Sequence, residues 1–257
     1  MIFSILEKTG SKILVLLINT GSIASFFAQA LYWLVSSKIN FRNLFKQMYA
    51  IGVMSLPVVL TTGMFTGMVL AVQSYFQLRQ FTVETSVATI IGLSMTRELG
   101  PVLTALMLAG RVGASMTAEL GTMKVTEQLD ALHSLASNPV KYLVVPRLIS
   151  GIILTPILTI YAILIGIIGG YLISVKLFDV PSVFYLSNLQ RSVHVSDVTS
   201  GLKKAVVFGL IIVLIGCYKG FNATGGAEGV GKATMQSVVL SSMLILISDF
   251  FLSVLLF

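Results

Sequence analysis

The sequence predicts an all-α integral membrane protein with about five transmembrane helices, preceded by an N-terminal helix in the membrane interface. Apolar residues make up 56% of the 257-residue chain and charged residues only 11%, whereas soluble domains carry about 25% charged residues. Several runs of roughly 18 or more mostly apolar residues are long enough to span a bilayer. Because backbone groups in lipid have to pair within their own segment, these spans are expected to be helices.

The apolar runs place the expected spans near residues 50–72, 85–110, 148–175, 198–218 and 233–257, within one transmembrane domain over 48–257. Most of the 17 Lys and Arg residues fall on the side that holds the segment before the first span. By the positive-inside rule this side is the cytoplasm, and the C-terminus lies on the opposite side. The net charge of +7 follows this asymmetry, so we do not expect nucleic acid as a partner.

Residues 1–47 precede the first span and have a mixed character. Their apolar run ILVLLI is followed by polar residues at Asn19, Thr20, Ser22, Ser25 and Gln29. A helix lying in the interface fits this composition, and a sixth span is the alternative. Lys38, Arg42 and Lys46 recur every fourth residue, which forms a basic stripe suited to anionic lipid headgroups.

The glycine-rich stretch Gly226–Ala233, GAEGVGKA, nearly matches the nucleotide-binding loop G-x-x-x-x-G-K-[ST]. Ala233 stands where a Ser or Thr would hold magnesium, and the stretch follows an expected membrane helix instead of a buried strand. We interpret it as a glycine turn joining two helices. The chain is therefore expected to carry no cofactor and no ATPase of its own. His133 and His194 lack a ligand-like spacing, so no metal site is expected.

An amphipathic stretch between the second and third spans predicts a short cytoplasmic helix over residues 118–133. One side of this helix carries apolar and small residues, and most of the other side is charged. Such helices fit into grooves of partner proteins; lying against lipid is the alternative, although several acids fit an anionic leaflet poorly. The candidate partner contacts are Glu119, Leu120, Met123, Lys124, Glu127, Gln128 and Asp130.

The stretch TRELGPVLTALMLAGRVGASMTAELGTMKVTEQLDAL, together with the later GGAEGVGKAT, resembles the MlaE/YrbE permease family. Members are the membrane subunits of bacterial ABC systems that move phospholipids together with MCE proteins. The resemblance implies a homodimer that rests on two cytoplasmic ATPase subunits through the amphipathic helix, with ATP and magnesium bound by those subunits. It also implies a hexameric periplasmic MCE ring and, in many systems, a small STAS-domain protein.

Charged residues occur inside the expected spans, beginning with the adjacent Arg97 and Glu98. A charge at the centre of a span costs about 2.5–3.5 kcal/mol, which makes such residues functional candidates. Neighbours on a helix point about 100° apart, so these two cannot simply pair with each other. Gly100-Pro101 adds an expected break in the helix. Lys203, Lys204 and Asp249 lie at a similar depth, so we expect five ionisable residues to converge on one layer near the outer face.

Two interpretations of this charged layer remain open. It is either a structural network with lysines reaching the interface, or a polar pocket in which cations meet a lipid phosphate, with Arg97 holding the phosphate oxygens as a fork. In the second case, the acyl chains would lie along Leu70, Tyr75, Leu78 and Phe81. The paired small residues of Gly63–Gly67 and Gly166–Gly170 let helices approach closely, either within one chain or across a dimer.

Taken with the resemblance, these features predict a non-enzymatic permease subunit in the bacterial inner membrane. It would move phospholipid between that membrane and a periplasmic MCE protein and so maintain outer-membrane lipid asymmetry. One alternative is an ion-coupled secondary transporter that uses Arg97, Glu98 and Asp249 as a proton relay, although no inverted repeat is evident. Another is a structural anchor for a periplasmic partner. Dependence on a partner's ATP hydrolysis separates the first function from the other two.

Overall fold

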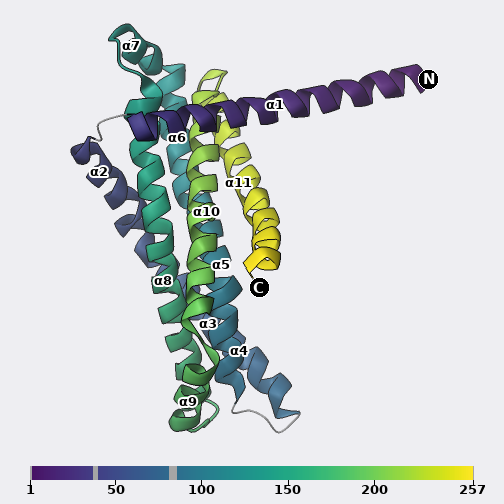
Figure 1. Ribbon diagram of the computed structural model, residues 1–257, viewed down its shortest axis with the longest axis vertical. Coiled ribbons are helices and arrows are strands. Elements are labelled where there is room, and N and C mark those ends of the chain that lie inside the picture. The colour runs from purple at the N-terminus through teal and green to yellow at the C-terminus, as the bar shows by residue number, and fades with distance from the viewer. Residues whose placement is uncertain (1, 37–39, 81–85, 257) are drawn as a thin grey trace.

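The computed structural model describes residues 2–36, 40–80 and 86–256, and the regular elements in these ranges are helical (Figure 1). The α-helices are α1 Ile2–Ser36, α2 Phe41–Ile51, α3 Leu56–Arg79, α4 Val87–Ser94, α5 Gly100–Leu108, α6 Ala114–Val125, α7 Gln128–Ser134, α8 Val145–Lys176, α9 Ser182–Ser192, α10 Val195–Phe221 and α11 Gly226–Leu256. Short tighter or wider turns connect some of them: the 3₁₀ turn η1 Val53–Ser55 and the π-helical turns η3 Met95–Leu99, η4 Ala109–Gly113 and η5 Val140–Val144.

Five helical stretches in the described ranges are long and apolar enough to cross a membrane. They are Phe41–Arg79, Val87–Val125, Val140–Lys176, Val195–Phe221 and Gly226–Leu256. Each overlaps one of the five expected spans, so the fold class predicted from the sequence is confirmed. The stretches are longer than the apolar runs because polar residues at their ends continue the helices.

Helix α1 lies across the end of the bundle that also carries α7 (Figure 1). The ring of Phe26 contacts Tyr218 and Phe221 of α10 at centroid distances of 5.9 and 5.6 Å. Near the end of α1, the ammonium of Lys141 lies 5.6 Å from the centre of the Trp33 ring. An orientation across the bundle is the one expected of an interfacial helix.

Helices α3 and α8 pack with their backbones in direct contact. A Cβ added to Gly67 would overlap the backbone of Gly166, and one added to Gly63 would come within 2.9 Å of the carbonyl oxygen of Ala162. Glycine lets the helices approach this closely. The small-residue motifs therefore form an intrachain contact, which was one of the two possibilities that the sequence left open.

The second stretch passes through Gly100-Pro101 without the break that the sequence suggested. The N–H of Gly100 donates to the carbonyl of Met95 across the wide turn η3, and Pro101 lies in the first turn of α5. Proline is tolerated in the first turn, where its missing N–H has less consequence. The helix therefore widens at this point and then continues.

The prediction of a single helix over residues 118–133 is wrong. Helix α6 continues the second stretch to Val125, Glu127 adopts a left-handed backbone with φ of 59°, and α7 begins at Gln128. Two contacts accompany the break: the hydroxyl of Thr126 bonds back to the carbonyl of Thr122, and Lys124 pairs with Asp130 at 3.1 Å. Helix α7 lies at the tip of this end of the bundle (Figure 1).

The glycine-rich stretch Gly226–Ala233 was interpreted as a turn, and this placement is also wrong. The turn lies only at its start, where Gly225 and Gly226 have φ of 89° and 66°, and residues 226–233 form the first two turns of α11.

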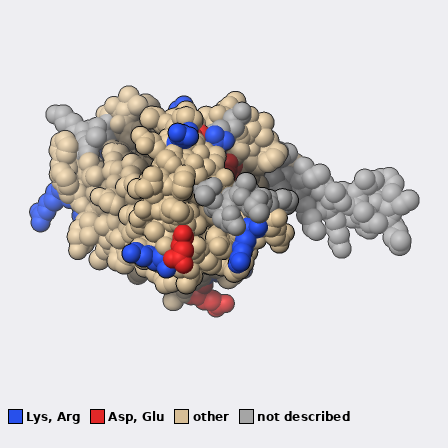
Figure 2. Space-filling view, turned by 90° about the horizontal axis from the view of Figure 1, so that it is seen from below, with Lys and Arg blue, Asp and Glu red and all other residues tan. Residues whose placement is uncertain are grey.

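The end of the bundle opposite α7 has a largely uncharged surface. The view from below shows only a few scattered Lys, Arg, Asp and Glu side chains on it (Figure 2).

Candidate functional site

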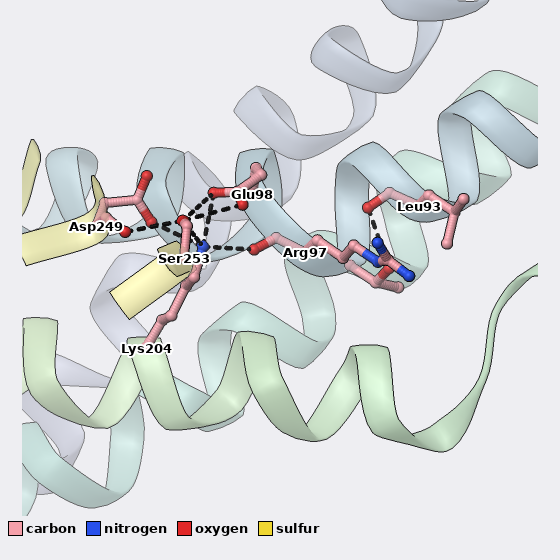
Figure 3. A network of polar contacts seen from close by, with 7 residues as sticks. Leu93, Arg97, Glu98, Lys204, Asp249 and Ser253 are labelled. Atoms are coloured by element: carbon pink, nitrogen blue, oxygen red, sulfur yellow. Dashed lines mark hydrogen bonds and ion pairs between the residues drawn. The ribbon is translucent and has the colours of Figure 1, made fainter. Parts of the chain in front are cut away.

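A polar network joins the second stretch to α10 and α11 (Figure 3). Its centre is Lys204 of α10, whose side chain is fully buried. The Lys204 ammonium donates to Glu98 Oε2 at 2.7 Å and to Ser253 Oγ at 2.7 Å, and it lies 3.0 Å from Asp249 Oδ1. A buried cation is tolerable only when it is paired and hydrogen-bonded. Two carboxylates and a hydroxyl from two other helices supply these partners.

The motif Arg97–Pro101 supplies a fourth partner through its backbone. In an α-helix, the carbonyl of residue 97 would accept from the N–H of residue 101. Pro101 has no N–H, so this carbonyl is left available, and it accepts from Lys204 Nζ at 3.1 Å. A glutamate, a wide turn and a proline in sequence thus give one lysine both a side-chain and a backbone acceptor.

Arg97 extends away from Lys204 (Figure 3) and serves a second polar contact. Its Nε donates to Asp197 Oδ1 at 2.9 Å, and its Nη2 lies 2.8 Å from the same oxygen. The other oxygen of Asp197 accepts from the backbone N–H of His194 at 2.9 Å, which closes a cap on the first turn of α10. A carboxylate at a helix N-terminus is also stabilised by the helix dipole.

The expected convergence of five charges is therefore only partly right. Glu98, Lys204 and Asp249 meet directly, and Arg97 contributes its carbonyl while its guanidinium pairs elsewhere. Lys203 is exposed and lies outside this network, because the residue next to Lys204 points about 100° away on the helix.

Two residues of these networks escaped the sequence argument, Asp197 and Ser253. Asp197 is buried and binds the guanidinium of Arg97, yet in the sequence it looks like an ordinary acid at a helix start. Its position three residues after the cap residue His194 was the available signal. Ser253 lies 3.2 Å from Glu98 Oε1 and bonds to the carbonyl of Asp249. Ser253 is one of five serines in the apolar helix α11, and nothing in the sequence distinguishes it from the other four.

The proposed acyl-chain residues lie along α3. Leu70, Tyr75 and Leu78 are half-buried and pack against a cluster that includes Met95. The Tyr75 ring stacks on Phe178 at 4.0 Å. Leu70 also lines an open cavity of about 340 Å³ together with Leu99, the residue after Glu98. Phe81 lies outside the described residues.

The predicted partner contacts divide into buried and exposed groups. Leu120 is fully buried, so its side chain does not face a partner. Glu119 pairs at 2.8 Å with Arg147 of α8, whose side chain is only 1% exposed. Met123 and Lys124 are half-buried, and Lys124 pairs with Asp130. The exposed candidates are Glu119, whose side chain is 54% exposed beside Arg147, and Glu127, Gln128 and Asp130 at and after the break.

Comparison with known proteins identifies the family of this chain. The family described as Permease MlaE matches residues 44–255. A protein of Rickettsia conorii, named a probable ABC transporter permease, is 46% identical over 257 residues, which cover 100% of this chain and 99% of the relative. A Synechocystis protein with a similar name is 44% identical over 237 residues, covering 91% and 90%.

A third relative carries a more specific name. The intermembrane phospholipid transport system permease protein MlaE of Haemophilus influenzae is 38% identical over 258 residues, covering 100% of this chain and 99% of the relative. Permease subunits of ABC systems are not enzymes themselves, and they work with an ATPase partner in a membrane. With its membrane-long helices, this chain belongs to the MlaE family of ABC transporter permeases.

Proposed function

We propose that this chain moves phospholipid between the inner membrane and a periplasmic MCE protein, and thereby maintains the lipid asymmetry of the outer membrane. The observation that carries the proposal is a pair of charges left partly exposed beside apolar walls. The side chains of Arg97 and Glu98 are 39% and 42% exposed, whereas Lys204 of α10, which bonds to the carbonyl of Arg97 and to the carboxylate of Glu98, is fully buried. The name of the Haemophilus relative supports phospholipid as the substrate.

In this proposal, the lipid phosphate approaches the guanidinium of Arg97, whose planar fork suits two phosphate oxygens. Glu98 and Asp249 hold Lys204 in place when no lipid is bound. The acyl chains follow the surface of α3 near Leu70. Because Arg97 is already paired with Asp197, the phosphate shares or replaces that carboxylate, so binding is reversible and not tight.

The proposed assembly is a homodimer with the N-terminus in the cytoplasm and the C-terminus in the periplasm. The ATPase binds at the end of the bundle that carries α7, where Glu127, Gln128 and Asp130 are exposed. A hexameric MCE ring covers the opposite end, and a small STAS-domain protein binds the ATPase. ATP hydrolysis in the ATPase moves α6 and α7 and so changes access to the polar network.

The test is lipid transfer from liposomes that contain the complex purified through this chain, with a fluorescent phospholipid and the MCE protein as acceptor. Transfer should require ATP and should fall at least tenfold in Arg97→Ala. The matched control is Arg191→Ala, which removes an exposed arginine at the same end of the molecule. Transfer without ATP, or equal transfer by both variants, would contradict the proposal. ATP-independent proton flux that is lost in Asp249→Asn would favour the ion-coupled alternative.

A further inference from the structure

A second apolar groove lies away from the charged network, between α2, the start of α3 and α8. It encloses about 430 Å³, within the range of about 300–1,000 Å³ typical of ligand pockets. Its lining is almost entirely apolar and includes Phe45, Tyr49, Val53, Leu154, Ile157 and Tyr161. In Figure 1, α2 and the neighbouring part of α8 lie in the half of the bundle nearer α1 and α7.

The groove is open because the chain turns beside it with a glycine. Gly52 is buried between α2 and η1, and a Cβ at this position would come within 3.2 Å of both methyl groups of Leu154. The next residue, Val53, is 50% exposed, so it borders the groove without covering it. The described side chains therefore leave the apolar groove open along α8.

Two exposed cations on α2 are helix neighbours of residues that line the groove. Arg42 and Lys46 are exposed on α2, and each lies three residues before a groove residue, Phe45 and Tyr49 respectively. Residues three apart are neighbours on a helix surface. A third cation, Lys141, belongs to the turn η5, which is joined to α2 because Asn43 Nδ2 donates to the carbonyl of Tyr142 at 3.0 Å.

No acidic residue occurs in the sequence of the two stretches that form the groove, Phe41–Arg79 and Val140–Lys176. An anionic headgroup at Arg42 and Lys46 would therefore meet no carboxylate from these stretches. This differs from the Lys204 network, where two carboxylates surround the cation. The groove combines apolar walls for hydrocarbon with two exposed cations on α2. The acid that shares a pocket with α2, Glu119 of α6, lies beside Gln47 and Ala50 and pairs with Arg147.

We propose that this groove binds one anionic phospholipid of the cytoplasmic leaflet. The phosphate lies between Arg42 and Lys46, and an acyl chain fills the groove beside Gly52. The site is separate from the substrate path at Arg97, and it rests on the proposed orientation that places this end of the bundle in the cytoplasm. Each cation near a membrane surface contributes about 1 kcal/mol, roughly a fivefold gain in affinity, so two cations predict a preference for anionic over zwitterionic lipid of about 25-fold.

The test uses a single fluorescent reporter at the groove. Trp33 is the only tryptophan in the chain, so Phe45→Trp in a Trp33→Phe background places the only indole beside the groove. The full-length variant is reconstituted into liposomes and titrated with phosphatidylglycerol or phosphatidylcholine carrying brominated acyl chains, which quench indole on contact. Half-maximal quenching should need about 25-fold less phosphatidylglycerol than phosphatidylcholine.

Two further variants separate the charge from the groove. Arg42→Gln with Lys46→Gln should abolish the preference, whereas the control Arg191→Gln with Lys232→Gln, which also removes one exposed arginine and one exposed lysine, should keep it. Val53→Phe should weaken quenching by both lipids because the added ring fills the groove.

Equal quenching by the two lipids, or a preference that survives loss of both cations, would overturn the proposal. Protection of the reporter from both lipids in the assembled complex would also overturn it, because a partner's helix would then occupy the groove. ATP-driven lipid transfer measured on the same liposomes reports on the proposed transport function independently.

Discussion

Replacing Lys204 with methionine removes the cation that Glu98, Asp249 and Ser253 share. Methionine keeps most of the side-chain length and fits a buried position, so the change tests charge more than volume. Removing one partner of a buried ion pair typically destabilises a protein by about 3–5 kcal/mol, because the other charge is left unpaired. The side chain of Glu98 is 42% exposed, so its unpaired charge would not be fully buried. We therefore expect a destabilisation at the lower end of this range, about 3 kcal/mol.

For a chain of this size, about 1 kcal/mol shifts the thermal midpoint by about 2–4 °C. Lys204→Met should therefore lower the midpoint of the purified permease by about 6–12 °C, measured by circular dichroism in detergent at pH 7. Lys203→Met is the matched control: it is the same change, one residue earlier, at an exposed position. Surface changes of this kind stay within about 0.5 kcal/mol, which corresponds to a shift of at most about 2 °C.

A triple variant separates lost charge balance from lost packing. Adding Glu98→Gln and Asp249→Asn to Lys204→Met neutralises the two carboxylates that were left behind. We expect most of the lost midpoint to return, since replacing a whole buried ionic group is far less harmful than removing half of it. The reasoning would be refuted if Lys203→Met and Lys204→Met shifted the midpoint equally, or if the triple variant were less stable than Lys204→Met.

Two further predictions concern backbone contacts. Gly67→Ala should strongly reduce the yield of folded protein, because its Cβ would overlap the backbone of Gly166. The control Gly110→Ala should leave the yield unchanged, because nothing lies within 4 Å of its added Cβ. The yield of monodisperse protein after gel filtration measures both effects. Pro101→Ala supplies an N–H that can bond to the carbonyl of Arg97 and compete with the lysine ammonium. We expect ATP-driven lipid transfer to fall several-fold while the thermal midpoint changes by less than about 4 °C; unchanged transfer would show that the carbonyl contact is dispensable.

The five membrane-long helices could be predicted because the bilayer leaves few alternatives. An apolar run of sufficient length has to pair its backbone internally, so length and composition decide the element. The meeting of Glu98, Lys204 and Asp249 could also be predicted, because each lies near the same depth when residues are counted along its span. Depth follows from sequence position alone.

The rotation of a helix about its axis does not follow from sequence position, and this explains the error at Lys203. Lys203 and Lys204 have the same depth, but only the packing of α10 decides which of them points inward. The break at Thr126-Glu127 was missed for another reason: a left-handed backbone at a glutamate is uncommon, and the local sequence contains no glycine or proline there. Asp197 was missed because its role depends on an arginine 100 positions earlier.

The unequal embedding of the helices has a consequence for how the bundle would come apart. Of the five membrane-long stretches described, α11 buries the smallest share of its most apolar window, and α10 buries the largest. Asp249 and Ser253 of α11 are nevertheless fastened to Lys204 of α10. Lys204 therefore binds the helix that buries the smallest share of its apolar window. Weakly packed elements open before the rest of a protein. Loss of the contacts of Lys204 with Asp249 and Ser253 should therefore let α11 detach locally, while α3 and α8, whose backbones are in direct contact, stay packed together.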